Sequence, residues 1–146
     1  MSHPESNQNV DATMLGYAEK AVEMARSRGV QLDYSLKSVH QVEELAAAIR
    51  RRSEKRLHSD EYGDPAPDWD PSEHPDYSEL ALMLGAYIGE VMRRRWGGNL
   101  HNPGQGARLL AGSEDLNPCG LAFLRLTQGR DNLAKYVRRV AKKFEG

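Results

Sequence analysis

Residues 80–98 read LALMLGAYIGEVMRRRWGG, and this stretch decides the fold. Its apolar residues recur at helical spacing and cover most of the circumference of the first half, which predicts a helix in the centre of the molecule. Gly85 and Gly89 lie four residues apart inside it. Because glycine costs about 1 kcal/mol relative to alanine in a helix, the pair indicates that another backbone packs close against this face. The glycine pair at 97–98 ends the helix, and a capping pattern at 76–79 predicts a start near Tyr77.

Apolar stripes at helical spacing predict three further helices, at 10–28, 36–57 and 132–144. Ser35 and Asp131 are the expected N-caps of the second and third of these. Between the first two helices, residues 30–34 alternate apolar and polar side chains, which fits a short strand or an extended linker.

The segment after the central helix is rich in turn residues. Residues 107–111 (ARLLA) predict a short strand, whereas 121–127 (LAFLRLT) fit either a helix opened by Pro118 and closed by Gly129 or a strand. In the helical case Leu121, Leu124 and Phe123 pack inward. We therefore expect a helix-dominated α+β domain with four or five helices and a two- or three-stranded sheet. An all-α bundle is the alternative.

The composition fits one soluble globular domain. The chain has 146 residues, 28% of them charged, and a formal net charge of −1. We expect a flexible N-terminus at 1–9 and a single domain at 10–146. The start lacks a basic stretch followed by an apolar one, and the longest uncharged run, 80–89, is about half of the ~20 residues that a membrane helix needs. Cys119 is the sole cysteine, so a disulfide within the chain is excluded and a cytoplasmic location is expected.

Residues 58–76 (HSDEYGDPAPDWDPSEHPD) form an acidic, proline-rich segment with aromatic residues among the acids. Proline stiffens a loop and lowers the entropy cost of ordering it on a partner. Aromatic anchors ringed by charge are typical of protein-binding hot spots. The alternative is a solvated linker. The residues predicted to contact a partner protein are Asp60, Glu61, Tyr62, Asp64, Asp68, Trp69, Asp70 and Glu73.

Glu90 is the first charge after ten uncharged residues and is the one candidate for acid or base chemistry on the central helix. A buried carboxylate with a raised pKa serves that role in many enzymes. Arg93 and Arg94 lie three and four residues on, so a structural ion pair is the favoured interpretation. A small hydrolase using Glu90 with His101 or Asn99 is kept as an alternative.

Other chemistry is disfavoured. The histidines show no ligand spacing, the acids of 58–76 do not match a calcium loop, and Cys119 has no base beside it in sequence, so no metal, cofactor or catalytic residue is predicted. The glycines at 97–106 match no phosphate-binding motif. The basic runs at 50–52, 93–95 and 135–143 lack interleaved aromatics, which disfavours nucleic acid as a partner. The charges at 43–56 are expected to form a solvated face.

Three pieces together resemble a family of small, largely uncharacterised bacterial domains: LDYS at 32–35, LGAYIGEVMRRRWGG at 84–98 and NPCGLAFLRLTQGRDNLAKYV at 117–137. Some members are thought to be immunity or accessory proteins beside secreted toxins. The resemblance implies a non-enzymatic protein-binding role beside a toxin. The acids of 58–76 would complement a basic partner, so a basic toxin domain is the expected one. A homodimer formed through the Gly85–Gly89 face is the third alternative.

Overall fold

The computed structural model describes residues 11–61, 77–101, 108–111, 114–129 and 132–145. Within them the chain forms five helices and a three-stranded antiparallel sheet, so the predicted helix-dominated α+β domain is confirmed and the all-α alternative is wrong. The elements are α2 (Ala12–Arg26), α3 (Ser38–Glu61), α4 (Tyr77–Trp96), β1 (Asn99–His101), β2 (Arg108–Ala111), β3 (Glu114–Leu116), α5 (Pro118–Gln128) and α6 (Leu133–Glu145).

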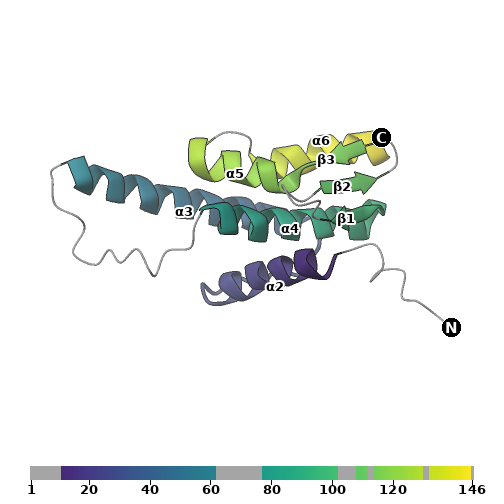
Figure 1. Ribbon diagram of the computed structural model, residues 1–146, viewed down its shortest axis with the longest axis horizontal. Coiled ribbons are helices and arrows are strands. Elements are labelled where there is room, and N and C mark those ends of the chain that lie inside the picture. Colours follow the sequence, from purple (N-terminus) through teal and green to yellow (C-terminus); the bar gives the residue numbers. More distant parts are fainter. Residues whose placement is uncertain (1–10, 62–76, 102–107, 112–113, 130–131, 146) are drawn as a thin grey trace.

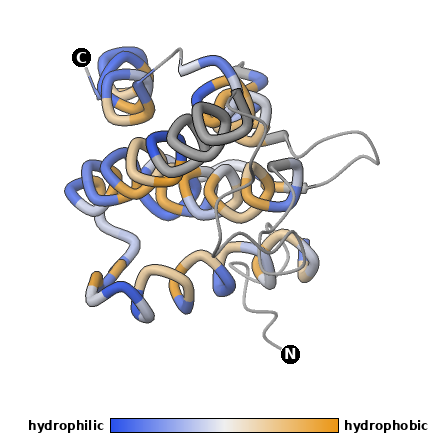
Figure 2. Tube along the Cα trace, turned by 90° about the vertical axis from the view of Figure 1, so that its left-hand side faces the viewer, coloured by the Kyte–Doolittle hydropathy of each residue, from blue (hydrophilic) through white to orange (hydrophobic). Residues whose placement is uncertain are grey.

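Helix α4 is the centre of the fold, with α2 packed on one side and α5 on the other (Figure 1). Figure 2 shows the same layering end-on, with α2 in the lower layer. Both contacts are close because the facing side chains are small. Helix α2 presents a buried alanine stripe (Ala18, Ala21, Ala25), and at Gly85 an added Cβ would lie 2.3 Å from the Cα of Cys119 in α5. The close backbone predicted from the glycine pair is confirmed.

Helix α3 packs against α5 and α6, and its second half extends past the other helices in Figure 1. Its N-terminus is capped as predicted, since the backbone N–H of Ser38 donates to the hydroxyl of Ser35 at 3.1 Å. The predicted bounds were wrong at both ends, because the helix begins at Ser38 and continues to Glu61. Residues 54–57 (EKRL) have good helix propensity, and no glycine or proline occurs between them and Glu61, so the helix runs on. Residues 30–33 form neither strand nor helix.

The sheet is a meander in the order β1-β2-β3. Leu100 pairs with Leu109, and Leu109 pairs with Leu116. All three leucines are buried, and Leu100 reaches Gly89 of α4, so one face of the sheet covers the end of the central helix. The strand predicted at 107–111 is confirmed as β2.

The ambiguous segment before Gly129 is helical. Pro118 occupies the first turn of α5, and Gly129 ends it with φ +69°, the left-handed conformation that glycine adopts without strain. Phe123 was expected to pack inward but is 40% exposed, because Cys119, Ala122 and Leu126 form the buried face. At the start of α6 the Asn132 side chain accepts the N–H of Lys135, while the expected cap, Asp131, lies outside the described residues. Among the described residues no helix combines the length and apolarity that crossing a bilayer requires.

Candidate functional site

The predicted partner-binding segment is placed only in part. Asp60 and Glu61 belong to the last turn of α3, and not to a loop beginning at 58 as expected. The other predicted contact residues lie outside the described residues: Tyr62, Asp64, Asp68, Trp69, Asp70 and Glu73. The structure describes the two helices that the acidic segment connects: α3 ends at Glu61 and α4 begins at Tyr77. We call these two helices the frame of the segment.

Glu90 is buried in α4 and paired with two arginines of the same helix. Arg93 donates to both carboxylate oxygens, at 2.6 Å and 2.8 Å, and Arg94 donates to one of them at 2.8 Å. Burial alone would raise the pKa of Glu90, but the hydrogen bonds from Arg93 and Arg94 outweigh it and lower the pKa below the ordinary value. The same contact raises the pKa of Arg93. The predicted structural ion pair is confirmed.

This geometry opposes the hydrolase alternative. A general acid needs a raised pKa and an open oxygen facing the substrate. Glu90 has a lowered pKa, and both of its carboxylate oxygens accept hydrogen bonds from the guanidinium groups of Arg93 and Arg94, one helical turn away. Asn99 lies on the exposed side of β1. The side chain of His101 is outside what the structure describes.

A tyrosine pair extends this ion cluster toward the linker before α3. Arg94 lies 3.8 Å above the ring of Tyr34, and that ring packs against Tyr87 at 4.7 Å between centroids. Tyr34 has φ +63°, a left-handed conformation that costs a non-glycine residue energy. Its backbone N–H donates to the hydroxyl of buried Tyr87 at 2.7 Å, which holds the linker in this conformation.

The Tyr87 hydroxyl also lies 2.7 Å from the hydroxyl of Ser38. Because Ser38 already donates its proton to the carbonyl of Ser35, Tyr87 is the donor of this bond. Burial raises the pKa of Tyr87, so the phenol keeps that proton at neutral pH. The network anchors the start of α3 to the middle of α4. Sequence analysis did not find it, although the Asp33–Ser35 pattern is a known turn signal.

A second buried ion pair connects α3 to α5 and α6. Glu43 accepts two bonds from Nε of Arg125 and one of 2.7 Å from its Nη2, and also accepts the backbone N–H of Leu133 at 2.9 Å. About two turns further along α3, Arg50 donates to the backbone carbonyl of Leu126 at 3.0 Å. Glu43 and Arg50 were expected on a solvated face, and that expectation was wrong, because Glu43 is buried against Arg125 and Leu133 and Arg50 is half-buried with a bond to Leu126.

The cysteine and the histidines were the remaining candidates for a nucleophile or a metal ligand. Cys119 is buried against Gly85, and its thiol lies 3.8 Å from the carbonyl of Leu82. His40 is exposed on α3. Within the part of the chain that the structure describes, no three histidine, cysteine or acidic side chains gather as a metal site would require.

The Gly85–Gly89 face is occupied inside the molecule. Cys119 fills the space at Gly85, and Leu100 and Pro118 fill the space at Gly89. This face is therefore not open to a second copy of the chain, because α5 and β1 already cover it. The homodimer alternative would need another surface.

One open surface feature is a groove of about 180 Å³ between the first turns of α3 and the length of α6. Its apolar lining residues, which we call the floor, are Leu36, Val39, Ala134, Val137 and Ala141. Its polar lining residues, which we call the rim, are Lys37, His40 and Arg138, and all three are exposed. Sequence analysis missed it, because neither helix alone reveals that its neighbour leaves the space unfilled.

Comparisons with known proteins add no family to this picture. Protein-family models, curated proteins and solved structures were searched, and none matches the chain.

Proposed function

We propose that this chain is a non-enzymatic protein-binding domain of the immunity type, which inhibits a bacterial toxin by occluding it. The observation that carries the proposal is the sequence of the segment at 62–76, where Tyr62 and Trp69 stand among acids and prolines. Large aromatic side chains with a charged surround supply most of the binding energy in protein interfaces. A toxin that handles phosphate groups has a basic active site, and an acidic segment complements it and speeds association.

The frame around the segment supports this role. Helix α4, which the segment precedes, packs closely against α5 at Gly85, and the first turns of α3 are held to the fold through the Tyr87–Ser38 contact and through Glu43. Binding residues carried by a rigid scaffold lose less entropy on association. The commitment of Glu90 to Arg93 and Arg94 further favours a binding role over the hydrolase alternative.

A cytoplasmic location is part of the proposal. The single cysteine forms no internal disulfide, which agrees with a reducing compartment. An inhibitor that protects the producing cell is needed there.

The test compares two double charge reversals in the full chain. One is Asp68→Lys with Asp70→Lys, and the matched control is Glu19→Lys with Glu23→Lys, both exposed positions on α2. Tagged proteins are used to capture partners from the native host, and affinity for the captured protein is measured by calorimetry. We expect the first variant to lose affinity at unchanged melting temperature and the control to retain it.

A replacement of 62–75 by a glycine-serine linker is the second arm, with 60–61 retained because they belong to α3. Equal affinity of wild type and both segment variants would remove the acidic segment from the interface. Turnover of a substrate by the purified chain, abolished by Glu90→Gln at unchanged fold, would replace the proposal by the hydrolase alternative.

A further inference from the structure

We propose that the α3–α6 groove is a second docking site, which takes an acidic amphipathic helical segment of a partner protein. This inference goes beyond the proposed function and does not depend on the segment at 62–76. It rests on three observations: an apolar floor, the helical spacing of the residues that line it, and a surplus of positive charge around it.

The floor has the pattern of a helix-binding groove. Ala134, Val137, Arg138 and Ala141 follow the i, i+3, i+4, i+7 spacing along α6, and Leu36 and Val39 face them from the start of α3. At 1.5 Å per residue this covers about two helical turns. Small alanines on α6 leave room for the side chains of a ligand, as in grooves that receive the apolar face of an amphipathic helix.

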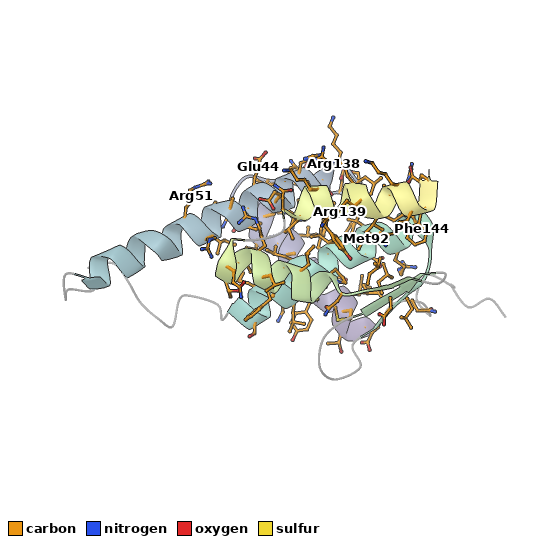
Figure 3. All side chains as sticks on the ribbon, turned by 90° about the horizontal axis from the view of Figure 1, so that it is seen from above. Glu44, Arg51, Met92, Arg138, Arg139 and Phe144 are labelled. Carbon is orange, nitrogen blue, oxygen red and sulfur yellow. The ribbon has the colours of Figure 1, made fainter. Side chains whose placement is uncertain are left out.

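The charge around the groove is predominantly positive. Lys37 and Arg138 lie at the rim, and within the described part of the chain Lys135 and Lys142 make no ion pair and are exposed on α6. Glu145, the acid at the end of α6, accepts bonds from Arg95 and Trp96. Glu44 is the exposed acid on the adjacent turns of α3, as Figure 3 shows near Arg138. A ligand with acids flanking an apolar stripe matches this surface.

An apolar floor also argues against nucleic acid as the occupant. A surface that binds phosphate backbones needs cations, and one that binds single strands adds exposed aromatic rings on which bases stack. The groove has aliphatic side chains at its floor and no aromatic residue among those that line it.

Arg138 and Arg139 provide a matched pair for the test. They are adjacent, exposed and of one residue type on α6, where Figure 3 labels both. Of the two, only Arg138 lines the groove. Reversal of either charge changes the net charge equally. General attraction therefore predicts equal effects, whereas docking in the groove predicts unequal ones.

The probes are fluorescein-labelled helical peptides with leucine or phenylalanine at the spacing of the groove and glutamate, glutamine or lysine at all other positions. Affinity is measured by fluorescence anisotropy with the full chain. We expect the glutamate series to bind, Arg138→Glu to weaken binding about tenfold, and Arg139→Glu to weaken it less than about threefold. Ala141→Leu, which fills the groove at constant charge, should also abolish binding.

The inference is overturned if the glutamate series does not bind, or if Arg138→Glu and Arg139→Glu lose equal affinity. Unchanged binding by Ala141→Leu, or a DNA duplex that competes with the peptides, would also overturn it. Sedimentation of the protein alone is run beside these. A dimer that Arg138→Glu dissociates would make a second copy the occupant and would also overturn it.

Discussion

Replacement of Gly85 by alanine tests the packing of the central helix most sharply. The new Cβ would lie 2.3 Å from Cα and 2.6 Å from N of Cys119, whereas carbon atoms in contact are about 3.5–4.0 Å apart. Both obstructing atoms are backbone, so no rotamer change relieves the clash and α4 must separate from α5 by more than ~1 Å. Overpacking of this kind costs about 1–3 kcal/mol or more, and the helix propensity of alanine returns about 1 kcal/mol. Because backbone atoms cannot move aside, we take the upper end of that range, about 3 kcal/mol, and expect a net loss of about 2 kcal/mol after the gain in helix propensity.

Gly16 is the matched control, since it also lies inside a helix but has nothing within 4 Å of its added Cβ. Gly16→Ala should stabilise the protein by about 0.5–1 kcal/mol. Gly89→Ala should fall between the two, because the nearest atom is the flexible end of Leu100 at 2.8 Å. Urea unfolding followed by far-UV circular dichroism gives the free energies at equal m-values. If Gly85→Ala proves as stable as Gly16→Ala, α4 and α5 do not meet at this point.

Three further predictions concern the buried polar groups. The folded-state pKa of Glu90 is lowered from 4.5, so its contribution to stability is present above that pH and is lost as the pH falls below it. Glu90→Gln should cost about 3 kcal/mol at neutral pH and flatten the acid side of a melting-temperature profile; an equally steep profile would contradict the ion pair. Glu43→Gln should cost about 3 kcal/mol, because Arg125 loses its partner. The control Glu44→Gln, at the exposed neighbouring position, should change the free energy of unfolding by less than about 0.5 kcal/mol. Similar values for the two in thermal denaturation would refute the buried pair. Tyr87→Phe should cost about 1–3 kcal/mol by removing the acceptor of a linker N–H, and amide hydrogen exchange at Tyr34 should accelerate; unchanged exchange there would count against the contact.

The elements with strong local signals were predictable. The bounds of α4 followed from one apolar run with a capping pattern before it and glycines after it, and α5 could be delimited by Pro118 and Gly129. These signals act within one or two turns, so the sequence displays them directly. Strands β1 and β3 are three residues long, which is too short for an alternation of apolar and polar residues to be recognised in the sequence.

The contacts that connect the elements were not predictable. Glu43 and Arg125 are 82 positions apart, and each looks like a surface charge in its own helix. The left-handed backbone of Tyr34 depends on the Tyr87 hydroxyl 53 positions away. The α3–α6 groove likewise arises from how two helices are juxtaposed, and each helix is ordinary by itself.

Photo-cross-linking at position 69 in the native host tests the central claim most directly. A photoreactive phenylalanine analogue replaces Trp69 in one protein and the exposed Gly16 of α2 in a control. We expect position 69 to form an adduct with one protein. Excess wild-type chain should compete this adduct away, whereas excess of a chain carrying Asp68→Lys and Asp70→Lys should leave it in place. No adduct at 69, or the same adducts at 69 and 16, would contradict a protein-binding role for the acidic segment.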